Sequence, residues 1–165
     1  EGMAPYAWSR AVGPKGDATA YGEERMGRMA AQGGWIVAEV NGAAVAGFHG
    51  YPLPEHPDPI PDDFEPMFRP LQELENAAPL TWYIHVLAAT PGARGHGWGS
   101  RLLGVAEDLA REGELAAMSI IVADNNTGAR RLYERRGFAE TDRRVMVKGG
   151  WHSEGTAWIL MTKAL

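Results

Sequence analysis

The sequence predicts a mixed α/β fold of the α+β class, in which helices pack on the faces of a mixed sheet. Residues 33–51 contain two apolar strands joined by Asn41-Gly42, a pair that suits a type I′ hairpin turn. Further along, residues 99–113 and 126–138 place apolar side chains at helical spacing, and each segment follows a short apolar run typical of a buried strand. This order of elements is the one expected of a mixed sheet covered by helices.

The first predicted element is a helix over residues 17–32. Asp17 is expected as its N-cap, although Gly22 and Gly27 lower the helical propensity of the segment. The hairpin of residues 33–51 comes next, and we expect it to lie in the centre of the sheet.

A long surface excursion follows at residues 51–80. It holds eight of the eleven prolines, which are disfavoured in helix interiors and central strands, and a short helix is expected near residues 70–78. Seven acidic residues and one arginine give the excursion a formal charge of −6, whereas the remainder of the chain carries about +1. A functional lid and a solvated insertion both stay open for this segment.

After the excursion the chain is expected to alternate between strands and helices. A buried strand over residues 81–89 precedes an amphipathic helix over 99–113, whose apolar face is formed by Leu102, Leu103, Ala106, Leu109 and Ala110. A second buried strand over 116–123 leads to a short helix that ends at the glycine C-cap Gly137. Residues 143–149 and 156–165 complete the sheet as a closing pair of strands.

Length and composition point to one compact domain spanning residues 1–165, because 45% of its residues are hydrophobic. The absence of cysteine excludes disulfides, thiolate metal sites and a cysteine nucleophile. The net charge of −5 argues against a nucleic-acid-binding protein. The sequence has neither a leader pattern nor a membrane-spanning apolar run, so we expect a soluble, cytoplasmic protein. Because the first residue is Glu rather than Met, an incomplete or processed N-terminus and a missing first strand stay open.

The stretch RGHGWGSRLL, residues 94–103, has glycine at every second position from Gly95 to Gly99 and then continues into the predicted helix. The first turn of a helix has unpaired N–H groups and a positive dipole end, and glycines let those groups approach an anion closely. The stretch therefore predicts a phosphate or pyrophosphate site. It lacks the Gly-Lys-Ser/Thr of a nucleotide P-loop and the spacing of a G-x-G-x-x-G fingerprint, so ATP, NAD and FAD are disfavoured as ligands.

The remaining spacing, Arg94-x-x-Gly97-x-Gly99, resembles the R/Q-x-x-G-x-G/A signature of the GCN5-related N-acetyltransferases, the GNAT superfamily. It follows a strand ending in VLAATP, which is similar to the family's L-x-V-x-P, and it precedes an amphipathic helix. Further along, NTGARRLYERRGF at residues 126–138 resembles the family's second hallmark, N-x-x-A-x-x-x-Y-E-x-x-G-F. The resemblance extends from about Gly34 to the C-terminus, apart from the excursion. It implies the GNAT fold, a mostly antiparallel mixed sheet of six to seven strands with splayed strands at an acyl-CoA cleft.

The resemblance implies that acetyl-CoA is the acyl donor and co-substrate. In the family, backbone amides of the glycine-rich turn hold the pyrophosphate, which here implies Arg94, Gly95, His96, Gly97, Trp98, Gly99 and Ser100. The pantetheine arm pairs with the preceding strand, which implies contacts with Leu87, Ala88 and Ala89, and the Leu87 amide holds the thioester oxygen. Trp98 and His96 depart from the family's usual residues, and we expect Trp98 to pack beneath the turn. Asn126 matches a residue that contacts the arm, but a helix N-cap role competes with that contact.

Two catalytic roles follow from the same resemblance. Tyr133 is implied as the general acid near the coenzyme sulfur, a role that a buried aromatic position does not exclude. The base is less fixed in the family, and Thr81 stands where the histone-acetylating branch has Glu. His85 is the best candidate, in an HVLA setting similar to that of arylalkylamine acetyltransferases, while a structural role for it stays open. We expect His85 on the same strand face as Leu87, with Tyr83 the next nearest candidate.

The family implies direct transfer of the acetyl group to a primary amine in a ternary complex. The acidic excursion favours a cationic small-molecule amine as acceptor, and Glu73 and Glu75 are the carboxylates to test. A peptide or protein amine, and a non-catalytic acyl-CoA-binding regulatory module, stay open as alternatives. The spacing of the histidines predicts no metal. A homodimer, common in the family, also stays open.

Overall fold

The computed structural model describes residues 3–31, 33–57 and 59–165. Three residues that entered the sequence predictions, Glu1, Gln32 and Asp58, lie outside the described residues. The chain forms two compact units. One unit consists of the described part of residues 1–34 together with Lys148–Glu154, and the other consists of Trp35–Val147 and Gly155–Leu165.

The first unit is built on two helices, α1 (Met3–Val12) and α2 (Ala18–Ala31). Helix α1 was not predicted from the sequence. Its Pro5 lies in the first turn, where a missing backbone N–H costs nothing because that N–H has no helical partner. The Tyr6 hydroxyl donates to the Gly149 carbonyl at 2.7 Å, which ties α1 to the 148–154 segment of this unit.

The predicted start of α2 is confirmed. Asp17 Oδ1 accepts hydrogen bonds from the amides of Thr19 and Ala20 at 2.9 and 3.0 Å, as an N-cap does. Gly22, which lowers the helical propensity, has a packing reason to be glycine, because a Cβ there would lie 2.3 Å from the Trp8 ring of α1. The residue that weakens the helix is the one that lets the two helices approach.

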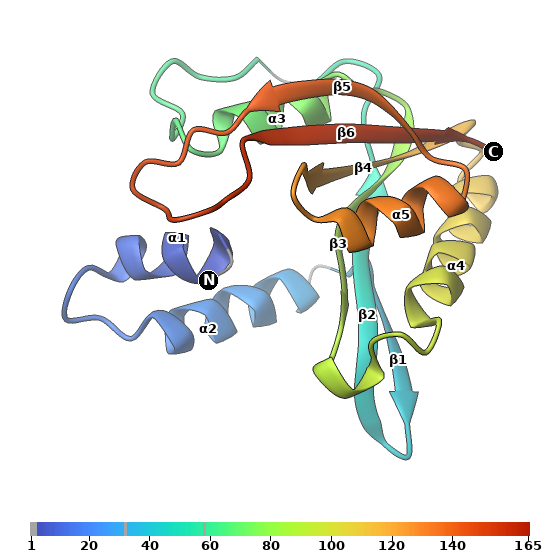
Figure 1. The fold of residues 1–165 in the computed structure, drawn as a ribbon, viewed down its shortest axis with the longest axis horizontal. Coiled ribbons are helices and arrows are strands. Elements are labelled where there is room, and N and C mark those ends of the chain that lie inside the picture. Colours follow the sequence, from blue (N-terminus) through green and yellow to red (C-terminus); the bar gives the residue numbers. More distant parts are fainter. Residues whose placement is uncertain (1–2, 32, 58) are drawn as a thin grey trace. The chain divides into compact units, whose positions relative to one another are not determined.

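The second unit contains one six-stranded sheet. Its order is β1-β2-β3-β4-β6-β5, and every neighbouring pair is antiparallel except β3 and β4, which are parallel. Figure 1 shows β1 and β2 running almost crosswise to β4, β5 and β6, with β3 bending between the two sets. The predicted mixed, mostly antiparallel sheet is confirmed. The strands are β1 (Trp35–Val40), β2 (Ala43–Pro52), β3 (Thr81–Ala89), β4 (Ala117–Ala123), β5 (Ala139–Val145) and β6 (Ala157–Ala164).

The hairpin lies at the border of the sheet and not in its centre, so that expectation was wrong. Asn41 and Gly42 have φ angles of 52° and 78°, as a type I′ turn requires, and join β1 to β2. Strand β1 has a single neighbour, because β2 takes β3 as its other partner. A strong local turn signal identifies a hairpin but says nothing about its place in the sheet.

The first of the two closing strands is shifted from its prediction, whereas the second, predicted over residues 156–165, is found at Ala157–Ala164. Strand β5 covers Ala139–Val145 and not residues 143–149. Gly137, with a φ angle of 89°, ends helix α5 and turns the chain directly into β5, so the strand begins earlier than its apolar residues indicate. Five of its seven residues are exposed, and this is why the pattern of apolar residues hid it.

Two apolar cores lie on the opposite faces of the sheet. Helices α4 (Trp98–Glu112) and α5 (Thr127–Arg135) cover the larger core. Helix α3 (Arg69–Asn76) covers the smaller one, which contains Leu53, Leu74, Ala78, Tyr83 and Leu160. Because the excursion contributes Leu53 and Leu74 to this core, it is packed against the sheet over part of its length. No helix in the described part of the chain is both long and apolar enough to cross a bilayer.

Candidate active site

The glycine-rich stretch forms the turn at which α4 begins. A short 3₁₀ helix, η1 (Pro91–Ala93), leads into it. Gly95 and Gly97 have φ angles of 78° and 81°, in the left-handed region that glycine adopts at little cost. Gly97 is the N-cap of α4, and the Arg101 amide donates to its carbonyl at 3.1 Å. The predicted position of the stretch, at the N-terminus of a helix, is confirmed.

This turn presents a row of backbone amides. Within the residues that the structure describes, the amides of residues 95–100 donate to no backbone carbonyl, whereas the Arg94 amide donates to the Pro91 carbonyl at 3.4 Å. The positive end of the α4 dipole lies at the same place. A Cβ at Gly95 or Gly97 would occupy open space, so the missing side chains leave these amides accessible. The residues present therefore fit the pyrophosphate of an acyl-CoA, with the amides of 95–100 as donors.

Gly99 has a separate reason to be glycine. A Cβ at this position would lie 2.7 Å from Cδ2 of Leu132, so its absence lets α4 pack closely against α5. Trp98 is partly buried against the larger core, as expected, and the Arg101 guanidinium lies 5.0 Å over its ring. His96 is exposed, with Nδ1 2.9 Å from the carbonyl oxygen two residues earlier.

Strands β3 and β4 diverge toward their carboxyl ends. Their parallel ladder joins Thr81–Ile84 to Ala117–Ile120 and stops there, although both strands continue. The continuing part of β3 therefore has an unpaired edge on the β4 side, which suits a chain of amides such as pantetheine. Helices α4 and α5 begin beyond these carboxyl ends, so the glycine-rich turn and Asn126 belong to the same region. Leu87, Ala88 and Ala89 lie on the diverging part of β3.

A bulge in β3 places His85 and Leu87 on opposite faces of the sheet. His49 of β2 pairs with Val86, and the next residue of β2 pairs with Ile84, so His85 is the extra residue. Ile84 and Leu87 both pack into the core on the α4 face. The expectation that His85 shares a face with Leu87 was therefore wrong, because the bulge shifts the two-residue alternation by one position.

On the face covered by α3, His85 lies beside a second histidine. The Nδ1 atoms of His85 and His49 are 3.3 Å apart, within hydrogen-bond distance. His85 is exposed, whereas His49 is buried. Burial lowers the pKa of His49 from its ordinary value, so this ring is neutral at neutral pH and can accept a hydrogen bond. Sequence reasoning missed His49 as a partner, because 36 residues separate it from His85.

Helix α5 contributes Asn126 and Tyr133. Asn126 Oδ1 accepts a hydrogen bond from the Ala129 amide at 3.2 Å, so the competing N-cap role is confirmed. Tyr133 packs in the larger core next to Phe138, with 6% of its surface exposed. Burial raises the pKa of Tyr133 to about 12, so its hydroxyl is protonated at neutral pH and able to donate a proton.

Helix α3 adds carboxylates to the histidine face, in two different settings. The Tyr51 hydroxyl donates to Glu75 Oε1 at 3.2 Å, and the Tyr51 ring lies 6.1 Å from that of His85. Burial raises the pKa of Glu75, and the bond from Tyr51 opposes that shift. Glu73 instead accepts a hydrogen bond from Arg144 Nε of β5 at 3.1 Å. Glu73 and Glu75, the two carboxylates of the excursion singled out in the sequence, are therefore not equivalent.

Comparison with known proteins identifies the family. The sequence model of the acetyltransferase (GNAT) family matches residues 5–138, most of the chain. The chain belongs to the GNAT family. It is accordingly an N-acetyltransferase. No curated protein sequence matches the chain.

Solved GNAT structures share its fold. A GNAT acetyltransferase from Elizabethkingia anophelis with acetyl-CoA bound is 22% identical, with 87% of this chain and 83% of that chain covered and a TM-score of 0.60. A ribosomal-protein-alanine N-acetyltransferase from Brucella melitensis is 19% identical, with 91% and 80% covered and a TM-score of 0.60. The IAA acetyltransferase from Bacillus cereus ATCC 14579 is 16% identical, with 99% and 93% covered and a TM-score of 0.60. At these identities the likeness shows the fold and leaves the acceptor undetermined.

Two other residues of β3, Thr81 and Tyr83, lie in environments that do not favour a role as general base. The buried Thr81 hydroxyl donates to the Ala78 carbonyl at 2.8 Å and lies 2.7 Å from the Ser119 hydroxyl, a structural role. Burial first, and then the nearby Glu75 charge, raise the pKa of Tyr83 well above its ordinary value, which favours its protonated form and makes it less suited than His85 to remove a proton. Across residues 3–31, 33–57 and 59–165, no group of three or more histidines and carboxylates is arranged to hold a metal ion.

Proposed function

We propose that this acetyltransferase moves the acetyl group of acetyl-CoA directly to a primary amine of a small molecule, in a ternary complex and with residues 1–165 acting as one domain. The observation that carries the proposal is the divergence of β3 and β4 at the end where the amides of residues 95–100 are unpaired. That combination offers donors for a diphosphate next to a strand edge for an amide chain. Leu87, Ala88 and Ala89 would take the pantetheine arm, and Asn126, which is exposed, would contact the same arm.

The transfer forms a C–N bond and breaks a C–S bond. The amine nitrogen attacks the thioester carbonyl carbon after its ammonium form has lost a proton, and the departing thiolate gains a proton, giving an N-acetylated amine and a free thiol. We assign proton removal to His85 and proton donation to Tyr133. Because His85 lies on the α3 face and Tyr133 on the α4 face, the two proton transfers approach from opposite sides of the sheet. The Leu87 amide is assigned to the charge that develops on the carbonyl oxygen.

His49 is assigned as a positioning residue for His85. When His85 takes a proton, both of its ring nitrogens carry hydrogen, and its Nδ1–H donates to the neutral His49 ring across 3.3 Å. Burial opposes protonation of His49 itself, so the acquired charge stays on the exposed ring. The hydrogen bond therefore stabilises protonated His85. Because Nδ1 is engaged with His49, Nε2 is the nitrogen assigned to the acceptor amine.

The acceptor is proposed to be a small cationic amine, because the excursion carries a formal charge of −6 and contributes Glu75 to the histidine face. A peptide amine is the alternative that the same charge supports. The retained acid, Tyr133, with its hydroxyl protonated at neutral pH, favours transfer over a regulatory role. The cytoplasmic location and a homodimer stay predictions.

The decisive experiment is a screen of primary amines with the purified chain and acetyl-CoA, read out as release of free thiol. Because the chain has no cysteine, a thiol reagent reports coenzyme A alone. We expect thiol release that depends on the amine. Stabilisation by acetyl-CoA without release from any amine would identify a regulatory module, and release with peptides alone would identify a peptide acetyltransferase. Stabilisation by ATP or NAD and not by acetyl-CoA would refute the assignment of the donor.

A further inference from the structure

Among the described residues, Glu75 differs from Glu73 in having no lysine or arginine paired with it. Its Oε1 accepts from the Tyr51 hydroxyl at 3.2 Å, whereas the ion pair of this helix with Arg144 is made by Glu73. Glu73, on the same helix, is paired with Arg144 at 3.1 Å. Partly buried charges in proteins are normally paired, so an unpaired carboxylate that the fold holds in place is suited to a cation from outside.

The aromatic rings near Glu75 also favour the binding of a cation. The Tyr51 and Tyr83 rings pack edge to face with centroids 5.5 Å apart, and aromatic rings attract cations through their electron-rich faces. Tyr83 is only 4% exposed and Tyr51 is half-buried, so Tyr51 is the ring of this pair that a ligand can contact. Carboxylate and tyrosines together form the kind of surface that binds an ammonium group.

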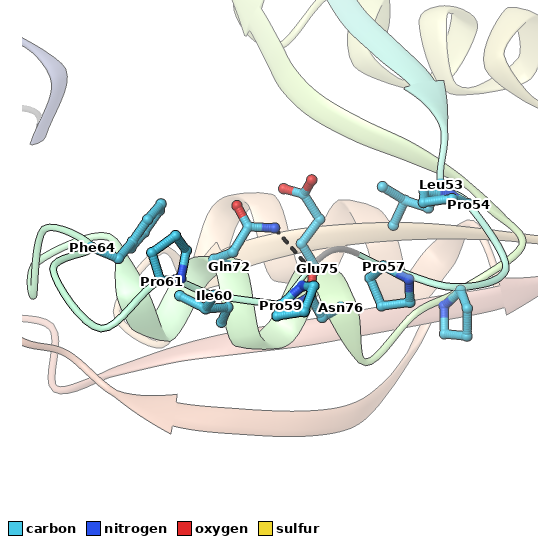
Figure 2. Close-up of a pocket in the computed structure, with 11 residues that line it drawn as sticks. Leu53, Pro54, Pro57, Pro59, Ile60, Pro61, Phe64, Gln72, Glu75 and Asn76 are labelled. Atoms are coloured by element: carbon cyan, nitrogen blue, oxygen red, sulfur yellow. Dashed lines mark hydrogen bonds between the residues drawn. The ribbon is translucent and has the colours of Figure 1, made fainter.

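Glu75 also borders a pocket of about 380 Å³ between α3 and the loop that precedes it. In Figure 2 Pro57, Pro59, Pro61 and Phe64 follow the loop, while Gln72, Glu75 and Asn76 project from the helix. Gln72 Nε2 donates to Asn76 Oδ1 at 3.0 Å, so these two amides are engaged with each other. The lining is otherwise apolar, formed by Leu53, Pro54, Pro57, Pro59, Ile60, Pro61, Phe64 and Pro79, and Glu75 is its single ionisable residue among those described. A group with one positive charge on an aliphatic stem matches this lining.

The chemistry of Glu75 decides which charge it can bind. The Tyr51 hydroxyl donates to Glu75, and the Tyr51 ring lies 6.1 Å from the ring of His85. A carboxylate stabilises the protonated form of an amine, which is the form that cannot attack a thioester. Glu75 is consequently suited to a charge that persists through the reaction.

We propose that Glu75, together with Tyr51 and the adjoining pocket, binds a second cationic group of the acceptor, so that the favoured substrates are aliphatic diamines and polyamines. The proposal rests on the acetyltransferase function proposed above. The amino group that reacts lies at His85, and the one that stays charged lies at Glu75, with the Tyr51 ring setting the distance between them.

The experiment compares 1,4-diaminobutane with n-butylamine as acceptors for the full chain and two variants. Glu75→Gln removes the charge but keeps an oxygen that can accept from Tyr51. Glu73→Gln is the matched control, because it removes a carboxylate from the same helix that already has a cationic partner. We expect kcat/KM to be about tenfold higher for the diamine in the parent chain, with that preference lost in Glu75→Gln and retained in Glu73→Gln.

Several outcomes would overturn the proposal. An equal kcat/KM for the two amines in the parent chain would do so, as would a diamine preference that survives in Glu75→Gln. Thermal unfolding of each variant shows whether it is folded. If the parent chain releases no thiol with either amine, the screen of primary amines decides the proposed function separately, and calorimetric binding of 1,4-diaminobutane to the acetyl-CoA-loaded protein decides the cation site. Binding that weakens about tenfold in Glu75→Gln supports the site, and binding that is absent or unchanged refutes it.

Discussion

Replacing Gly97 with alanine is expected to damage the glycine-rich turn in two measurable ways. Gly97 has a φ angle of 81°, and an L-residue in this region costs about 1–2 kcal/mol. A Cβ would meet no atom within 4 Å, so no steric clash adds to this cost. Alanine also restricts the unfolded chain, which returns about 0.4–1 kcal/mol. The net loss of about 1 kcal/mol corresponds to a fall in Tm of about 2–4 °C for a chain of this size.

The same substitution is expected to weaken acetyl-CoA binding. The new Cβ stands among the amides of residues 95–100, and loss of one hydrogen bond to a charged phosphate oxygen raises the Kd about tenfold or more. Calorimetric titration with acetyl-CoA measures this change in Kd. Thermal unfolding measures the loss of stability.

Gly104→Ala is the matched control, because it makes the same chemical change inside the same helix. A Cβ at Gly104 would have its nearest contact at 3.7 Å, an ordinary van der Waals distance, and the position is in the interior of α4. We expect stabilisation by about 0.5–1 kcal/mol and an unchanged Kd. If Gly97→Ala also raised Tm and left the Kd unchanged, the turn would neither require a left-handed residue nor hold the diphosphate.

Three further predictions concern the proton-transfer residues and the core. Tyr133→Phe should lower kcat about 100-fold, and because burial raises the pKa of Tyr133 to about 12, the parent chain should show no loss of activity from this group below about pH 11. His49→Phe should move the acid limb of the kcat/KM profile to lower pH, whereas His49→Gln, which keeps an acceptor, should move it less; an unmoved limb in both would exclude a positioning role. Glu107 is 8% exposed on α4 and bonded to Lys163 and Arg136; burial opposes ionisation, yet those bonds hold its pKa below the ordinary 4.5. The contribution of ionised Glu107 to stability is therefore present above about pH 4.5 and lost as pH falls through the folded-state pKa. Glu107→Gln should lower the free energy of unfolding in urea by about 1–3 kcal/mol at pH 7, and by less at pH 4.

Local patterns carried most of the secondary structure. The Asn41-Gly42 pair requires positive φ angles, and residues 81–89 match β3 residue for residue, because turn chemistry and apolar runs act over a few neighbours. The same holds for the start of α4, where glycines and unpaired amides belong to one short stretch. The donor could therefore be predicted from residues 94–100 together with the family resemblance.

Local sequence patterns did not predict helix α1 or the start of strand β5. Helix α1 has a proline in its first turn and no buried residue, so no buried apolar face marks it. Strand β5 is mostly exposed, so its apolar residues do not mark its start. In both segments the backbone conformation depends on elements distant in the sequence that pack against it.

The sequence by itself determined which backbone groups are bare at the start of α4 and which residue types the chemistry can use. The tertiary structure alone decided how those residues meet: a bulge turned His85 away from Leu87, strand pairing brought His49 to within 3.3 Å of it, and the packing of α3 separated the paired Glu73 from the unpaired Glu75. The physical reason is that backbone preferences are set by adjacent residues. Strand register and side-chain pairing depend instead on contacts between segments far apart in the chain, which no short stretch of sequence records.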